Sequence, residues 1–266
     1  MLIWHSADGT KSVRLSFEET QTPYTSGSQS ARRWTEDWAA ANLYCPACDA
    51  DSLAALPNNA PVADLECSAC DEQYELKSSK RSFGRKVVDG AYATMMTRLR
   101  SRQNPSLLLL NYDAEDLSVD NLIVIPRRLF TPELIEKRKP LAPAARRAGW
   151  VGCNIIIDRL PRSARIPMIR DRQIVFTKDV RKQWRKMAFL EEKADSAKGW
   201  LLDVLACVES LDCERFSLAD IYALEARLQA LYPGNSNVRP KIRQQLQVLR
   251  DNGIIEFLGG GEYRLT

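Results

Sequence analysis

The hydrophobic and polar positions of the chain divide it into segments with helical spacing and short apolar runs. Apolar residues recur at helical spacing in residues 30–44 and 87–100, which predicts two amphipathic helices. Apolar runs at 106–112, 121–126 and 165–169 predict strands. This mixture favours an α/β (α+β) core, with one sheet inside a three-layer arrangement.

The predicted helix over residues 87–100 rests on a single apolar stripe. Val88, Ala91, Met95 and Leu99 are spaced so that they would lie on one helical face. We therefore expect these four side chains to pack against the sheet.

The pattern changes near residue 177, where charged residues become frequent. We place a domain boundary there, with residues 1–185 as the first domain and 186–266 as the second. Three helices are predicted in the second domain, followed by a β-hairpin around three glycines, at 196–211, 217–232, 237–253 and 259–261. This order is typical of a winged helix, whose third helix enters the DNA major groove. A helical domain for protein contacts has the same outline and is the alternative.

Four of the seven cysteines form two Cys-x-x-Cys pairs, Cys45 with Cys48 and Cys67 with Cys70. Two such pairs place four thiolates tetrahedrally around Zn²⁺. The one histidine, His5, lies far from them in sequence. The four cysteines are therefore expected to occupy every coordination position of the ion. The pattern predicts a closed, structural zinc site.

The other cysteines, Cys153, Cys207 and Cys213, lack this spacing, and we expect buried thiols without a role. An odd number of cysteines with two metal-type pairs favours a reducing compartment. No apolar run approaches the roughly 20 residues of a membrane span, and the first residues lack the layout of a secretory signal. We predict a cytoplasmic protein with no membrane partner.

Residues 61–77, PVADLECSACDEQYELK, combine acids and a lysine with the second cysteine pair. Side chains alternate along a strand, so Glu75 and Lys77 project from one face while Leu76 points into the core. If the cysteine pair forms the tip of a hairpin, Asp64 returns beside Glu75. Two carboxylates bind a hard cation such as Mg²⁺, with the Leu76 carbonyl as a third oxygen ligand. Such acid-x-lysine triplets also occur on solvated strand faces, which is the alternative.

A further acid, Glu36, lies on the predicted helix of residues 30–44. We expect it to be a surface charge, and a place in the metal site is the alternative.

Charge and composition narrow the class of partner. The 266 residues include 45% hydrophobic and 27% charged residues, as in a globular protein. The net charge is only +4, but basic residues outnumber acids in residues 77–102 and 127–172. Basic stretches suit a polyanion such as DNA, although a solvated lysine and arginine face has the same composition.

Two segments supply candidate DNA contacts. Arg146, Arg147 and Trp150 lie in a proline-rich loop, residues 140–150, where they suit phosphate and base contacts. Trp150 packed in the core is the alternative. The polar positions of the third helix in the second domain add three candidates, namely Lys241, Gln244 and Gln247.

Segments spread over the chain resemble the DpnI-type methyladenine-dependent restriction endonucleases. The resemblance is carried by TEDW (35–38), YCPAC (44–48), PVAD (61–64), ELKS (75–78), DGAYATMM (89–96), KPLAP (139–143), ARRAGW (145–150), GCNI (152–155), KGW (198–200), KIRQQLQVLRD (241–251) and IIEF (254–257).

This resemblance implies a PD-(D/E)xK nuclease domain with a four-cysteine zinc site, followed by a winged helix. Asp64, Glu75 and Lys77 match the family's catalytic residues, and the four paired cysteines match its zinc ligands. It also implies Mg²⁺-dependent cleavage of double-stranded DNA at GATC sites containing N6-methyladenine, which restricts methylated foreign DNA. No obligate protein partner is inferred.

A preference for methylated adenine calls for an apolar or aromatic contact, because the methyl group replaces a donor hydrogen. Trp150 is the first candidate for it, and Trp200 is expected in the core. Two other functions stay open: a zinc-containing winged-helix regulator that binds DNA without cutting it, and a nuclease of branched or damaged DNA.

Overall fold

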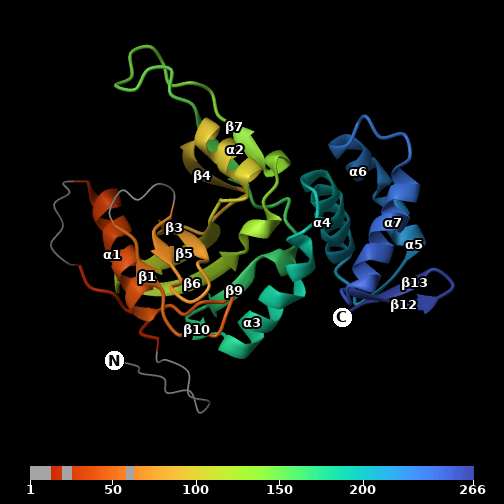
Figure 1. The fold of residues 1–266 in the computed structure, drawn as a ribbon, viewed down its shortest axis with the longest axis horizontal. Coiled ribbons are helices and arrows are strands. Elements are labelled where there is room, and N and C mark those ends of the chain that lie inside the picture. Colours follow the sequence, from red (N-terminus) through yellow and green to blue (C-terminus); the bar gives the residue numbers. More distant parts are fainter. Residues whose placement is uncertain (1–12, 20–25, 58–62) are drawn as a thin grey trace.

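The computed structural model describes residues 13–19, 26–57 and 63–266. Its centre is a seven-stranded sheet, in which only β3 and β5 run parallel (Figure 1). In sheet order the strands are β1 (Ala54–Ala55), β2 (Leu65–Glu66), β3 (Gln73–Ser79), β5 (Ser106–Asp113), β6 (Ser118–Ile125), β9 (Ile166–Arg170) and β10 (Gln173–Ile174). The strands predicted at 106–112, 121–126 and 165–169 are confirmed as β5, β6 and β9.

Two helices cover one face of this sheet, α1 (Gly27–Asn42) and α3 (Thr177–Lys186). Trp38 of α1 and Trp184 of α3 are both buried in one apolar cluster with residues of β3, β5 and β6. The helix predicted over residues 30–44 is therefore confirmed, although it begins earlier, at Gly27, and ends at Asn42.

The other face carries a second, antiparallel sheet and the helix α2 (Tyr92–Ser101). The strand order of this sheet is β4 (Lys86–Ala91), β8 (Gly152–Ile156) and β7 (Ile135–Lys137). Short 3₁₀ helices connect the main elements, at Arg127–Leu129, Pro132–Leu134, Arg162–Ala164 and Ala188–Leu190.

The single helix predicted over residues 87–100 is wrong in its first half. Residues up to Ala91 form β4, and Val88 is 60% exposed, although Met95 and Leu99 are buried as expected. The β-branched Val87 and Val88 favour a strand, and Gly90 disfavours a helix interior. Pairing with β8 therefore delays the helix until Tyr92.

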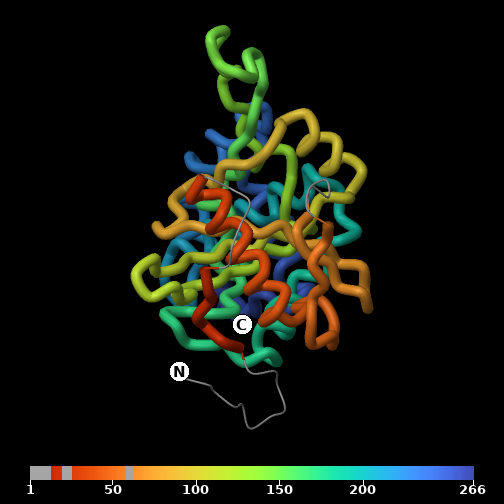
Figure 2. Tube along the Cα trace, turned by 90° about the vertical axis from the view of Figure 1, so that its left-hand side faces the viewer, coloured from red at the N-terminus to blue at the C-terminus, as the bar shows by residue number. Residues whose placement is uncertain are grey.

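Residues 138–151 form an arm between β7 and β8 that projects from the body of the molecule (Figures 1 and 2). Its base is held by backbone bonds, from Arg138 N to the Gly152 carbonyl (3.0 Å) and from Leu141 N to the Trp150 carbonyl (2.9 Å). The loop expected at 140–150 is confirmed, and its tip is exposed.

The C-terminal part contains a helix-turn-helix unit and a three-stranded wing. Its elements are α4 (Asp195–Ser210), β11 (Arg215–Ser217), α5 (Leu218–Ala223), α6 (Glu225–Leu231), α7 (Val238–Asp251), β12 (Ile255–Gly259) and β13 (Glu262–Leu265). The predicted helices and hairpin are present, except that the second helix is divided into α5 and α6 at Leu224. The short strand β11 was not predicted.

Helix α4 joins this unit to the rest of the molecule. Arg159, which follows β8, makes two hydrogen bonds to Asp203 of α4, at 2.8 and 2.7 Å, and the Tyr232 hydroxyl donates to the same carboxylate at 2.6 Å. Trp200 is buried, as expected, and stacks on Tyr232 with ring centroids 3.9 Å apart.

In the described part of the chain no helix has both the length and the apolar character needed to cross a membrane.

Candidate active site and metal centre

The four paired cysteines form one cluster. Their sulfur atoms all lie within 4.8 Å of one another, with Cys45 Sγ 3.7 Å from Cys70 Sγ and Cys48 Sγ 3.6 Å from Cys67 Sγ. Four sulfurs tetrahedrally placed around Zn²⁺ at about 2.3 Å would be about 3.8 Å apart. The donor set and its spacing therefore fit a structural zinc ion.

The surrounding elements hold the two cysteine turns in place. Arg181 of α3 donates to the carbonyl oxygens of Cys45 (3.4 Å) and Ala50 (3.1 Å). The second cysteine pair lies in the turn between β2 and β3, which pair antiparallel. The predicted hairpin with cysteines at its tip is thus confirmed.

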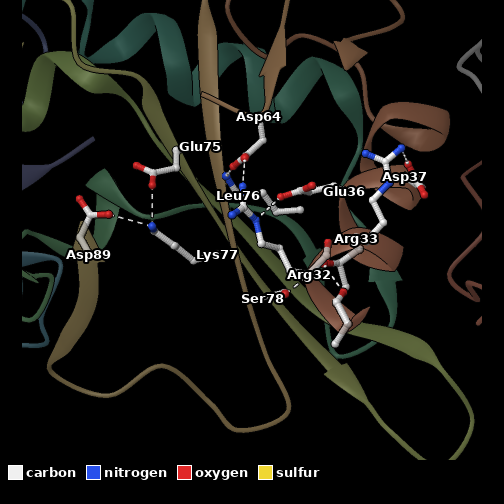
Figure 3. A network of polar contacts seen from close by, with 12 residues as sticks. Arg32, Arg33, Glu36, Asp37, Asp64, Glu75, Leu76, Lys77, Ser78 and Asp89 are labelled. Carbon is white, nitrogen blue, oxygen red and sulfur yellow. Dashed lines mark hydrogen bonds and ion pairs between the residues drawn. The ribbon is translucent and has the colours of Figure 1, made fainter. Parts of the chain in front are cut away.

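This hairpin places Asp64 against β3. The Asp64 N–H donates to the Tyr74 carbonyl at 2.9 Å, and one carboxylate oxygen accepts from the Leu76 N–H at 2.8 Å. Glu75 and Lys77 project from the same face of β3, with Lys77 Nζ 2.5 Å from Glu75 Oε1 (Figure 3). The structure therefore brings together the three residues expected to be catalytic.

A fourth charged residue, Asp89 of β4, was missed by the sequence analysis. Lys77 Nζ donates to Asp89 Oδ1 at 2.8 Å, and the Asp89 side chain is only 5% exposed. The sequence did contain a signal for Asp89. It lies two residues after Val87, so in a strand both side chains project from the same face, and in β4 that face is buried. The helical interpretation of this segment concealed that signal.

Helix α1 contributes two more charged side chains. Arg32 donates to Asp64 Oδ1 at 2.8 Å and to Glu36 Oε1 at 2.5 Å, so it bridges the two acids. The Glu36 side chain is 14% exposed. The expectation of a surface charge is wrong for Glu36, which lies next to the acidic site, and Arg32 was not singled out from the sequence.

The charges in this site perturb one another. Burial raises the pKa of Glu75 to about 7, an effect that the nearby Lys77 ammonium partly offsets. Burial opposes the charged form of Lys77, but Glu75 and Asp89 together hold its pKa above the usual value. Burial alone would raise the pKa of Asp89, but the charge and hydrogen bond of Lys77, together with the Gly90 N–H, lower it. The cations Lys77 and Arg32 contact four acids, namely Glu36, Asp64, Glu75 and Asp89, so the site has more acids than cations and can accept a further cation.

Two adjoining hollows meet at these residues. A pocket of about 330 Å³ extends toward α2, and a groove of about 500 Å³ follows the loop between β3 and β4. Both are lined by the same four charged residues, Arg32, Asp64, Glu75 and Lys77. The groove continues past serines and a lysine, namely Ser78, Ser79, Ser82 and Lys86.

The candidate DNA contacts lie apart from this site. Arg146 and Arg147 are exposed on the projecting arm, and the Arg147 guanidinium lies 4.9 Å from the centre of the Trp150 ring. Trp150 is half-buried and folds over Gly152 at the base of the arm. On α7, the outer face carries the remaining three, which are the half-buried Lys241 and the exposed Gln244 and Gln247.

The remaining cysteines agree only in part with expectation. Cys153 and Cys207 are buried, whereas Cys213 is exposed, so the prediction of a buried thiol is wrong there. Cys213 lies in the turn after α4, where the chain leaves the core to begin β11.

Comparison with known families gives two matches. Residues 13–193 match the DpnI model of the Dam-replacing family, and residues 196–265 match the Dam-replacing HTH domain. The first match contains the cysteine cluster and the acidic site, and the second runs from α4 to β13. The family implies a nuclease, and the HTH domain implies DNA binding. The chain belongs to the Dam-replacing family of DpnI.

Proposed function

We propose that the protein is a type II methylation-dependent restriction endonuclease. It hydrolyses phosphodiester bonds of double-stranded DNA at GATC sites that contain N6-methyladenine, and so restricts methylated foreign DNA. The observation that carries this proposal is the convergence of Asp64, Glu75 and Lys77 where the pocket meets the groove. A DNA-binding regulator would not require a lysine held between two buried acids.

The carboxylates of Asp64 and Glu75 and the Leu76 carbonyl would hold Mg²⁺, a hard cation that prefers oxygen ligands. When bound, Mg²⁺ would polarise a phosphate oxygen and lower the pKa of an attacking water. The Lys77 ammonium, 2.5 Å from Glu75 Oε1, would orient that water and offset the negative charge that develops on the phosphate.

The zinc ion proposed at the four cysteines has no part in the chemistry. A closed set of four thiolates leaves no position for substrate or water. Its role is to fix the hairpin between β2 and β3, and with it the distance between Asp64 and β3.

Recognition of the methylated site is assigned to two regions. The outer face of α7 would enter the major groove, where the amide groups of Gln244 and Gln247 suit adenine. The arm would contact the same DNA through Arg146, Arg147 and Trp150, and the indole would supply the apolar contact to the methyl group. We also propose that the domain boundary lies between residues 185 and 186, at the end of α3.

The decisive test uses one plasmid prepared with and without N6-adenine methylation at GATC. With Mg²⁺ present, we expect double-strand cleavage of the methylated plasmid only. Cleavage of both plasmids or of neither would contradict the proposal. The Lys77→Ala variant should bind methylated DNA but not cut it, whereas a regulator would show binding without cleavage in both wild type and variant.

A further inference from the structure

Tyr74 lies between the cysteine cluster and the acidic site, and the proposed function gives it no role. The residue is fully buried, and its hydroxyl oxygen is 3.1 Å from Cys45 Sγ. Its backbone carbonyl accepts the hydrogen bond from the Asp64 N–H at 2.9 Å. Because Glu75 is the next residue, Tyr74 contacts the metal cluster through its side chain and both acids through its main chain.

A hydroxyl at this position requires a partner. Burying a hydroxyl without a hydrogen bond is unfavourable, and phenylalanine would fill the same space without that cost. The ring lies near Trp184, with centroids 6.4 Å apart, and its hydroxyl faces the cluster. A zinc-bound cysteine is a thiolate with no proton to give, so the phenol must be the donor.

We propose that Tyr74 is a positioning residue that donates a hydrogen bond to the Cys45 thiolate and thereby couples the zinc centre to the acidic site. The inference rests on the zinc centre of the proposed function. Four thiolates around Zn²⁺ carry an excess of negative charge, and a donor beside one of them stabilises it. The same tyrosine fixes the backbone to which Asp64 is bonded, so ordering the cluster also orders the hairpin.

The Tyr74→Phe variant removes the hydroxyl and keeps the ring. Replacing a hydrogen-bond partner of a metal ligand typically weakens metal binding about 10-fold to 100-fold. We expect a loss of zinc affinity near the lower limit, about 10-fold, because the four ligands are retained. In protein loaded with Co²⁺, the sulfur-to-cobalt charge-transfer band should move to lower energy, since a thiolate without this donor gives up electrons more easily.

The matched control is Tyr112→Phe. Tyr112 is a buried tyrosine in the same apolar cluster, but its ring packs on Phe17, with centroids 5.4 Å apart, and not beside a cysteine. This variant should keep the wild-type zinc affinity and the wild-type cobalt band.

Zinc competition with a chelator and the cobalt spectrum should be measured on the full-length wild type and both variants, with circular dichroism to verify folding. A changed affinity and a shifted band in Tyr74→Phe alone support the proposal. An unshifted band in Tyr74→Phe, or equal changes in both variants, would overturn it. A wild-type protein that binds neither metal at the cysteines would instead refute the zinc centre, whatever the cleavage assay shows.

Discussion

The cysteine cluster and the acidic site share the β2–β3 hairpin, and they are built in different ways. The cluster takes all four ligands from two short turns, and its sulfurs are already at the separations that a tetrahedral ion needs. The acidic site takes its side chains from α1, from β3 and the residue before β2, and from β4. Here cations of the protein itself, Arg32 and Lys77, contact the acids (Figure 3).

On the proposed function, this difference would separate a zinc site that supports the fold from a Mg²⁺ site that exchanges its contents. A closed thiolate site contributes folding energy directly, because its ligands are brought together only in the folded chain. An open site whose acids are paired with protein cations must lose some of those contacts when it binds metal and phosphate.

Removal of zinc should abolish both the fold of the β2–β3 hairpin and the cleavage of methylated plasmid. Apparent binding energies of structural zinc sites reach about 10–16 kcal/mol, which is as large as the stability of a domain. Thermal unfolding and plasmid cleavage should be measured after chelation by a zinc-selective chelator and again after zinc is restored. Full activity with no metal at the cysteines would contradict the division between the two sites.

The second prediction concerns Asp89, which sharpens the comparison because it belongs to the acidic site alone. Asp89→Asn removes the charge that holds Lys77 Nζ on the side opposite to Glu75. A displacement of the lysine by about 1 Å should reduce the rate of single-turnover cleavage about 10²-fold. Affinity for methylated DNA, measured in Ca²⁺, should stay unchanged.

The control for Asp89 is Asp158→Asn, which breaks an ion pair with Arg85 at the surface, where Arg85 is 84% exposed. It should leave the cleavage rate within a few-fold of wild type, since exposed ion pairs contribute little. Equal rates for wild type and Asp89→Asn would show that Asp89 does not position Lys77.

The same contrast explains what could be predicted from the sequence. The cysteine ligands and the pair of Asp64 with β3 are close in sequence, so their spacing and strand alternation were sufficient to predict the hairpin. Asp89 and Arg32 reach the site only through the packing of β4 and α1 against β3. No local pattern gives the rotation of α1 that turns Arg32 and Glu36 toward Asp64.

The error at β4 has a specific cause. Val88, Ala91, Met95 and Leu99 have helical spacing, but the first of them is exposed and belongs to a strand. The helical periodicity corresponds to a helix only from Tyr92 onward. Because the predicted helix was extended back to residue 87, the strand-like alternation that places Val87 and Asp89 on one face was overlooked. The C-terminal unit was predicted more fully, because a Ser217–Asp220 capping box marks the start of α5 and Gly253 follows the end of α7.

The third prediction uses pH to separate the two metals. Glu75 has a pKa raised to about 7 by burial, so near and below that pH it carries a proton that Mg²⁺ must displace. The Mg²⁺ concentration for half-maximal cleavage should therefore rise as pH falls through 7, approaching about 10-fold per pH unit. The cobalt spectrum of the cysteine cluster, recorded over the same range, shows whether that site stays intact. A Mg²⁺ requirement independent of pH between about 8 and 6 would contradict the perturbed Glu75.

The smallest effect is expected from Arg32, which contacts Asp64 at the solvent side of the site. Its side chain is 64% exposed, so its attraction for Asp64 is screened and amounts to less than about 1 kcal/mol. Arg32→Ala removes this competing cation, and the Mg²⁺ concentration for half-maximal cleavage should fall about threefold. Arg33→Ala breaks the pair with Asp37 on the same helix and should leave the requirement unchanged. An increased requirement in Arg32→Ala would mean that Arg32 orders Asp64 for the metal and does not compete with it, which would make the acidic site as preorganised as the cysteine cluster.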